Sequence, residues 1–309
     1  MSKNVAFCSP LVAGWLFGLV TVVIWSFWIV TTRQAVTIDL PVAWIGIFRF
    51  ALPALALLPF WWRHGLLPRG RDKRLVGLMV AGAGAPFFLI VATGMHGTPA
   101  GESGILLGGS MPLFVALLSA AVLGERFAPA RLAGFALIIA ATVAIGGDAL
   151  LSGDLASRLL VFAGAALWSV FTLAFKRSGL PALAAAGIVA AWSTIMLVPL
   201  AALEGFEPVF AAGPFVVAGQ IFSQGVLSGV VALACYGAAV VRLGASRAAV
   251  LSALPPALAA LIAIPVLGEV PTPVTFIGIV LAAFGVALAS GAVTLRIPHR
   301  SAADRCPAR

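Results

Sequence analysis

The sequence predicts an all-α integral membrane protein in which ten transmembrane helices form two inverted five-helix repeats. Three observations predict this fold: the composition, the number of long apolar stretches and the distribution of positive charge. Hydrophobic residues make up 62% of the 309 residues and charged residues only 9%, whereas soluble domains carry about 25% charged residues. The chain has too little polar surface for water, so we expect it to lie in a lipid bilayer.

Each apolar stretch is about as long as a helix that crosses ~30 Å of hydrocarbon at ~1.5 Å per residue. The ten stretches are residues 11–32, 41–62, 75–95, 102–123, 130–147, 158–175, 183–203, 219–241, 247–267 and 273–291. The first is longer than the ~7–15 apolar residues of a signal peptide and no small-residue cleavage site follows it, so we expect a retained helix.

Positive charge is one-sided when it is counted over the loops between these stretches. If the amino terminus is cytoplasmic, sixteen of the nineteen basic residues fall on the inside, including those of a basic tail at 292–309. Arg33 and Arg158 fall outside, and Arg49 lies within a span. Because positive loops stay in the cytoplasm, the pattern predicts a bacterial inner-membrane protein with both termini cytoplasmic. It also explains the net charge of +9 without a nucleic-acid partner.

The two halves of the chain repeat each other. Trp25-Ser26 and Trp168-Ser169 are 143 residues apart, and Glu125 of one Gly-Glu turn is 144 residues before Glu269 of another. We therefore expect one repeat over 11–147 and a second over 158–291. Because each repeat holds an odd number of helices, the second enters the membrane from the opposite side, an arrangement typical of secondary transporters.

The chain resembles the EamA family of the drug/metabolite transporter superfamily. The motifs that carry the resemblance, in chain order, are Trp25-Ser26, Phe48-Arg49-Phe50, Gly124-Glu125, Gly134, Trp168-Ser169, Gly268-Glu269 and Gly278. The resemblance implies a central cavity lined mainly by the first, third, fourth, sixth, eighth and ninth helices. It also implies export of a small metabolite by alternating access, with an aromatic or other amino acid as the first expectation. Gly108-Gly109-Ser110-Met111 before Pro112 departs from the polar and aromatic residues of the aromatic amino-acid exporters.

Aromatic and hydroxyl groups dominate the candidate substrate site, which suits a small amphipathic molecule. Its predicted residues are Trp25, Ser26, Phe88, Thr93, His96, Ser110, Trp168, Ser169, Gln224 and Tyr236. The alternative is structural, because tryptophans often anchor at membrane interfaces, as we expect for Trp61, and membrane serines often bond to their own helix.

Two ionisable residues have competing interpretations. Arg49 is either a clamp for a substrate carboxylate or a packing arginine bonded to helix carbonyls. Glu102 is either a proton carrier or an acid favoured by the positive end of a helix dipole. Proton-coupled efflux of drugs or other metabolites is therefore an alternative function.

The sequence contains little that supports other classes of function. No nucleotide-binding motif occurs, and no metalloprotease or serine-hydrolase motif supports an intramembrane enzyme. The three cysteines, Cys8, Cys235 and Cys306, have no paired spacing. We expect a monomer with a small-molecule substrate, no cofactor and no metal.

Overall fold

The computed structural model describes residues 10–124, 126–152, 154–243, 251 and 254–289. Every regular element in these ranges is a helix, which confirms the predicted all-helical class. The predicted tail at 292–309 and parts of the last two apolar stretches lie outside the described residues.

The helices of the first half follow the predicted stretches closely. In chain order they are α1 (Pro10–Thr37), α2 (Val42–Ala56), α3 (Leu58–Trp62), α4 (Lys73–Ala83), α5 (Ala85–Gly94), α6 (Ala100–Ser103), η1 (Gly104–Gly109), α7 (Met111–Leu123) and α8 (Pro129–Ser152).

The second half has a similar series of helices. They are α9 (Leu155–Ser178), α10 (Ala182–Glu204), α11 (Glu207–Ala212), α12 (Pro214–Gln220), η2 (Ile221–Val231), α13 (Ala232–Leu243), α15 (Pro255–Leu267) and α16 (Pro273–Ala289).

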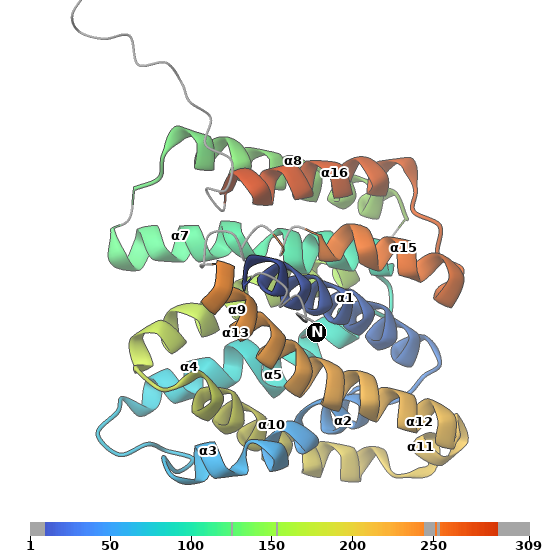
Figure 1. The fold of residues 1–309 in the computed structure, drawn as a ribbon. Coiled ribbons are helices and arrows are strands. Elements are labelled where there is room, and N and C mark those ends of the chain that lie inside the picture. Colours follow the sequence, from blue (N-terminus) through green and yellow to red (C-terminus); the bar gives the residue numbers. More distant parts are fainter. Residues whose placement is uncertain (1–9, 125, 153, 244–250, 252–253, 290–309) are drawn as a thin grey trace, which may run out of the picture.

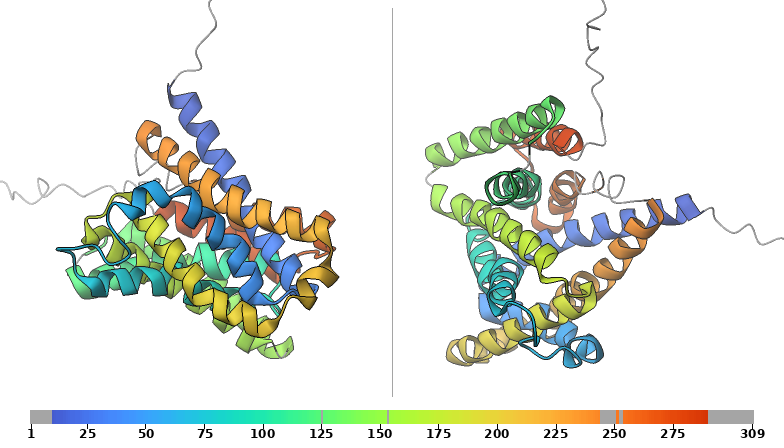
Figure 2. Two further views of the ribbon diagram at one scale, coloured as in Figure 1. Left: turned by 90° about the horizontal axis from the view of Figure 1, so that it is seen from below. Right: turned by 90° about the vertical axis from the view of Figure 1, so that its left-hand side faces the viewer.

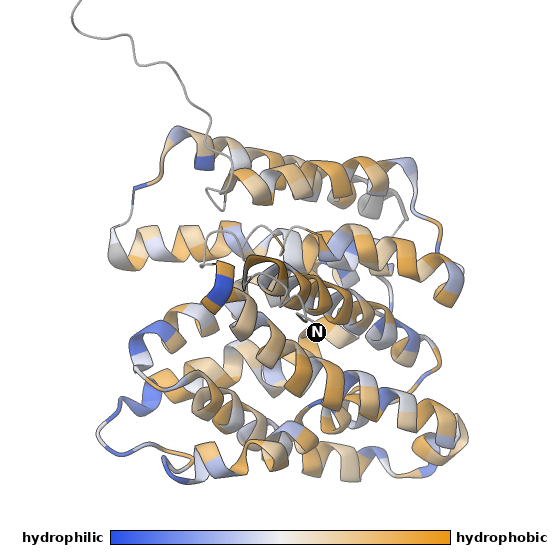
Figure 3. Cartoon of the chain, viewed as in Figure 1, coloured by the Kyte–Doolittle hydropathy of each residue, from blue (hydrophilic) through white to orange (hydrophobic). Residues whose placement is uncertain are grey.

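Among the described residues, six helical segments are long and apolar enough to cross a membrane, and four shorter apolar helices accompany them. Figure 3 shows apolar residues along the sides of the helices and hydrophilic residues mainly near their ends and in the connections. The chain is a multi-pass membrane protein, since apolar helix sides of this length match the hydrocarbon of a bilayer.

Two of the differences between the predicted stretches and the helices concern charged residues. The first stretch ends before Arg33 and the sixth begins at Arg158, whereas α1 continues to Thr37 and α9 begins at Leu155. Both arginines therefore lie within helices and not in loops. Their charges are matched by carboxylates from distant parts of the chain, which the apolar pattern does not reveal.

Several membrane helices are interrupted. Gly84 separates α4 from α5, and Pro53 lies inside α2 shortly before the break at Leu57. η1 and η2 are π-helical, with the wider backbone spacing that is often found at functional sites. η2, with 11 residues, takes up much of the long helical segment Pro214–Leu243.

The helices pack in pairs that join the two halves of the chain. Figure 1 shows α8 beside α16 at the top of the molecule, with α7 and α15 next to them. Figure 2 shows α1 and α13 projecting together from one side of the bundle. Further contacts join α2 to α10, α1 to α15, and α9 to α4, α5 and α7. The largest core cluster, which includes Phe87 and Phe88, draws on both halves.

Candidate functional site

Unpaired polar atoms gather where α1, α2 and η2 meet, a place we call the α1–α2–η2 junction. In the described part of the chain, six buried side-chain nitrogen or oxygen atoms lack a hydrogen-bond partner. Five of them belong to this junction: Trp28 Nε1, Arg49 Nε and Nη1, Gln224 Oε1 and Ser228 Oγ. Buried polar groups are nearly always partnered, so such a gathering marks a place where a ligand or water completes the bonding.

Glycine allows η2 and α2 to approach closely. A Cβ atom on Gly225 would lie 2.7 Å from the Phe48 carbonyl oxygen, and one on Gly229 would lie 2.3 Å from Pro53 Cγ. Neither position has room for a larger residue. The contact brings the backbone of Gln224 to Gly229 against the backbone that carries Arg49.

Arg49 reaches from α2 into a surround of aromatic rings. Its guanidinium carbon lies 4.6 Å from the centroid of the Trp28 ring, 5.7 Å from that of Phe50 and 5.8 Å from that of Phe88. Nε and Nη1 are buried without a partner, while the residue as a whole keeps some exposure. The ion pairs within the described ranges involve Arg33 and Arg158 but not Arg49. Ring faces stabilise the cation in part, and its hydrogen-bond donors stay free.

Gln224 contributes to the same junction from η2. It is fully buried, and its amide nitrogen donates to Thr32 Oγ1 at 2.9 Å and to Gln220 Oε1 at 3.3 Å. Thr32 lies one turn after Trp28 on α1, and the next residue of η2, Gly225, packs against Phe48 of α2, so Gln224 lies at the junction of these three helices. The junction therefore offers unpaired donors on Trp28 and Arg49 and two unpaired acceptors, Gln224 Oε1 and the Ser228 hydroxyl.

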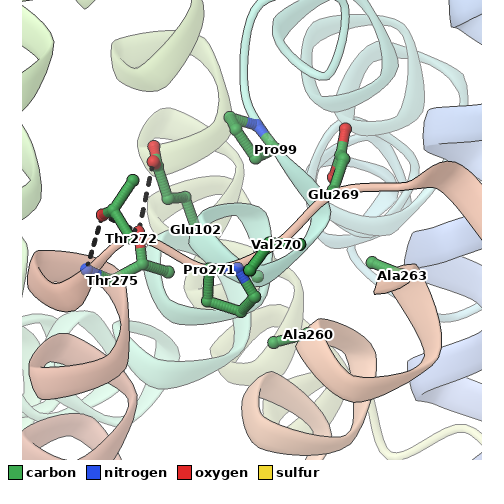
Figure 4. Close-up of a pocket in the computed structure, with 10 residues that line it drawn as sticks. Pro99, Glu102, Ala260, Ala263, Glu269, Val270, Pro271, Thr272 and Thr275 are labelled. Atoms are coloured by element: carbon green, nitrogen blue, oxygen red, sulfur yellow. Dashed lines mark hydrogen bonds between the residues drawn. The ribbon is translucent and has the colours of Figure 1, made fainter. Parts of the chain in front are cut away.

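The second charged region lies at the ends of α1 and α9. Arg33 Nε donates to Glu269 Oε1 at 2.7 Å, and Arg158 Nε donates to Glu102 Oε2 at 2.7 Å. Figure 4 shows Glu102 and Glu269 among the residues lining a cavity of about 40 Å³, room for little more than water. Arg158 is 6% exposed, but it lies in the first turn of α9 and so near the end of its span, whereas Arg49 lies in the middle of α2.

The two predicted tryptophans have separate aromatic partners. The ring centroid of Trp25 lies 5.3 Å from that of Tyr236, and the ring centroid of Trp168 lies 5.5 Å from that of Phe87. Ser26 and Ser169 donate to carbonyls one turn earlier in their own helices, and Ser26 also reaches the carbonyl of Pro255. Thus α1 with α13, and α9 with α5, form two similar aromatic contacts.

The other predicted residues are dispersed. Phe88 and Gln224 lie at the junction, whereas Thr93 and His96 are exposed near the end of α5. Ser110 lies against Thr142 of α8, with 3.3 Å between their hydroxyl oxygens. The structure thus brings Phe88, Gln224 and Arg49 together but not Thr93, His96 or Ser110.

Sequence reasoning missed Trp28, Thr32 and Ser228. A signal for Ser228 was present, because Gln220, Gln224 and Ser228 recur every four residues in an otherwise apolar span. Trp28 follows Trp25 by three residues, so it lies on a neighbouring part of the same helix face.

The chain is similar to a curated protein and to a solved structure. It is 32% identical over 230 residues to the "Probable terminal-alkyne amino-acid exporter" of Streptantibioticus cattleyicolor, which covers 72% of this chain and 74% of that protein. A solved structure described as "Crystal structure of protein" matches with a TM-score of 0.62 at 20% identity, covering 95% of this chain and 100% of the other. This second likeness concerns the fold alone.

A family match accounts for both halves. The EamA-like transporter family matches residues 12–147 and, a second time, residues 156–291. The two matched segments contain the Trp-Ser pairs, the Phe-Arg-Phe motif and the Gly-Glu turns on which the resemblance rested. The chain therefore belongs to the EamA-like transporter family and is a membrane transporter, not an enzyme.

Proposed function

We propose that this protein exports amino acids across the bacterial inner membrane as a secondary transporter that works by alternating access. The observation that carries the proposal is the buried guanidinium of Arg49, which has an aromatic surround and no carboxylate partner among the described residues. An unneutralised charge within a membrane span costs several kcal/mol and is typical of a functional site.

A substrate carboxylate would neutralise the Arg49 guanidinium and use its free hydrogen-bond donors. The planar guanidinium donates two parallel hydrogen bonds to a carboxylate, and such charge-assisted bonds are roughly twice as strong as neutral ones. Trp28 Nε1, also unpaired and buried, is a third donor next to it. The rings of Phe50 and Phe88 supply apolar surface for the rest of the molecule.

The likeness to a protein named as an amino-acid exporter supports the same substrate class. An amino acid combines a carboxylate with a side chain of variable polarity. The aromatic contacts of Trp25 with Tyr236 and of Trp168 with Phe87 provide further apolar surface on both sides of the bundle.

We also propose ten crossings in two inverted repeats, 11–147 and 158–291, with both termini cytoplasmic. The packing supports this arrangement, because contacts of α1 with α13 and α15 are matched by contacts of α9 with α4, α5 and α7. The pairs α2–α10 and α8–α16 join equivalent helices of the two repeats. An axis in the membrane plane would relate such halves and let them rock against each other around the site.

Counterflow in proteoliposomes tests the proposal. Liposomes loaded with an unlabelled amino acid should accumulate the labelled one for a short time, with saturation, and a panel of amino acids would identify the substrate. Arg49→Lys keeps the positive charge but loses the planar guanidinium that can donate two parallel hydrogen bonds. We therefore expect the apparent affinity for the amino acid to fall about tenfold. Arg49→Leu should reduce counterflow much further, whereas Arg63→Leu, at an exposed position, should leave it unchanged. Normal amino-acid counterflow by Arg49→Leu would contradict the proposed role of Arg49.

A further inference from the structure

We propose that Gln224 and Ser228 form a subsite for the ammonium group of the substrate, so that the transporter reads the complete zwitterionic head of a free α-amino acid. This inference rests on the proposed function and adds a second recognition element to the Arg49 clamp. Gln224 Oε1 and Ser228 Oγ are both buried and without a partner in the part of the chain that the structure describes.

The orientation of the Gln224 amide is fixed by a chain of hydrogen bonds. Gln220 Nε2 donates to the Thr31 carbonyl at 3.0 Å, which leaves Gln220 Oε1 as an acceptor for Gln224 Nε2. Thr32 Oγ1 donates to the Trp28 carbonyl at 2.7 Å, so it too accepts from Gln224 Nε2. Both hydrogens of the Gln224 amide are therefore used, and flipping the amide would place two acceptors against its oxygen.

The consequence is a buried acceptor with a fixed direction. Gln224 is 0% exposed, and its Oε1 has no partner. An unpaired carbonyl oxygen of this kind is costly unless a donor reaches it in some working state of the protein. An ammonium group, with three donors and no acceptor, satisfies it.

Ser228 lacks the hydrogen bond to its own helix that several hydroxyl residues of the membrane helices make. Ser169, Ser193 and Thr194 each donate to the carbonyl four residues earlier in their own helix. Ser228 lies in the π-helical segment η2, where the wider spacing moves the carbonyl of residue 224 out of this position. Its hydroxyl has no partner and lies one turn beyond Gln224, where it can accept from the same ammonium group.

A neutral acceptor suits this position better than an acidic one. A carboxylate at position 224 would place a negative charge at the junction and weaken the attraction of Arg49 for the substrate carboxylate. The glutamine oxygen attracts an ammonium group without competing for the guanidinium. The junction can therefore hold a carboxylate against Arg49 and Trp28 and an ammonium group against Gln224 and Ser228.

Competition by three related compounds tests the inference on the wild-type protein. The compounds are the amino acid that gives the strongest counterflow, its amide, which lacks the carboxylate, and its des-amino acid, which lacks the ammonium group. We expect the free amino acid to inhibit labelled counterflow at least about tenfold more strongly than either analogue, since each lost charge-assisted bond has about that effect. Equal inhibition by the free amino acid and its des-amino acid would overturn the inference.

Variants then assign the two halves of the head group. Gln224→Met should no longer prefer the amino acid over its des-amino acid. It should still prefer the amino acid over its amide. Arg49→Gln should show the reverse pattern. Ser228→Ala, the smaller change, should reduce the first preference several-fold, while the control Thr194→Val removes a hydroxyl bonded within its own helix and should change neither preference.

Failure of the proposed function is recognised separately. Absence of amino-acid counterflow in the wild-type protein would contradict amino-acid transport itself. If the wild type shows normal counterflow, the two variants can be compared. Equal preference of Gln224→Met and Thr194→Val for the amino acid over its des-amino acid would contradict only the Gln224 subsite. Ser228→Ala keeps this test available if Gln224→Met does not fold.

Discussion

Glu102 and Arg158, whose charged atoms lie 2.7 Å apart, join the first half of the chain to the second through a buried ion pair. The hydroxyl of Thr275 in α16 also donates to Glu102 Oε1 at a distance of 3.5 Å. Arg33 and Glu269 form a similar bridge between the halves, and the second oxygen of Glu269 accepts from the backbone nitrogen of Ala100 at 2.7 Å. Two ion pairs between the first and second halves of the chain therefore lie at the ends of α1 and α9.

These two arginines are the ones that the charge count placed on the side poor in positive charge. Each has a carboxylate partner, so neither leaves a free positive charge there. In the proposed topology this is the outward end, and we infer that the pairs hold it shut, since they join the elements that must separate if the halves rock apart. Glu102 is thereby engaged as an ion-pair partner, and a role in carrying protons would first require this pair to break.

The first prediction concerns the stability of the two pairs. The side chains of Arg158 and Glu102 are 7% and 4% exposed, against 14% and 20% for Arg33 and Glu269. Removing one partner of a buried pair costs about 3–5 kcal/mol because the other charge remains unpaired. Glu102→Gln should therefore lower the unfolding temperature in detergent more than Glu269→Gln. The double variant Glu102→Gln/Arg158→Met should recover much of the loss, and equal destabilisation by all three would contradict this account.

A second prediction concerns access to the outward end. Ala263 lines the small cavity of Figure 4 and is 1% exposed, so Ala263→Cys should react slowly with a water-soluble maleimide after the native cysteines are replaced. Adding Glu269→Gln should increase the labelling rate, because Glu269 no longer holds α1 and α6 together. Asp39→Asn, at an exposed position, is the control. An unchanged labelling rate with Glu269→Gln would show that other contacts close this end.

Orientation in the membrane is tested by cysteine reporters. Arg69→Cys should react only from the cytoplasmic side and Phe206→Cys only from outside, since the first lies in a strongly basic connection and the second between α10 and α11. Arg69 is preferred to its neighbour Gly70, whose φ of +73° is unfavourable for cysteine. Labelling of Arg69→Cys from the periplasm would disprove the ten-crossing topology.

The contact between α2 and η2 gives a prediction about glycine. Alanine at position 225 would place its Cβ 2.7 Å from the Phe48 carbonyl, so the helices must move apart and the Arg49 side chain with them. Overpacking of this kind costs roughly 1–3 kcal/mol. Gly225→Ala should lower both the unfolding temperature and counterflow, while Gly219→Ala, which meets nothing within 4 Å, should do neither. Similar behaviour of the two variants would exclude a tight contact at Gly225.

The sequence predicted the helical class and most helix positions, because apolar length alone decides which segments cross a bilayer. It misplaced Arg33 and Arg158 because their partners, Glu269 and Glu102, are 236 and 56 residues away along the chain. The site was predicted only in part for a similar reason. Arg49 and Gln224 could be picked out as polar residues in apolar spans, but their proximity depends on helix packing, and the free hydroxyl of Ser228 depends on a π-helix that no residue period reveals.

The last prediction concerns Trp168, which stands in the second repeat where Trp25 stands in the first. Its ring contacts Phe87 and Phe171 at centroid distances of 5.5 and 5.2 Å and keeps some exposure, so it can offer a face to the substrate. Loss of one large aromatic contact removes roughly 1–3 kcal/mol, and Trp168→Ala should therefore raise the apparent Km about tenfold or more.

The control for Trp168 is Trp62 and not Trp61. Trp61 is unsuitable as a control, because its indole donates to the Ala54 carbonyl at 2.7 Å and its ring packs against Gly187, so its removal would disturb the fold. Trp62 is 72% exposed, and Trp62→Ala should leave the Km unchanged. If both variants, at equal expression, change transport equally and mildly, the tryptophan of α9 is part of the scaffold. The substrate would then contact only the α1–α2–η2 junction, since the carboxylate and ammonium subsites proposed there do not depend on Trp168.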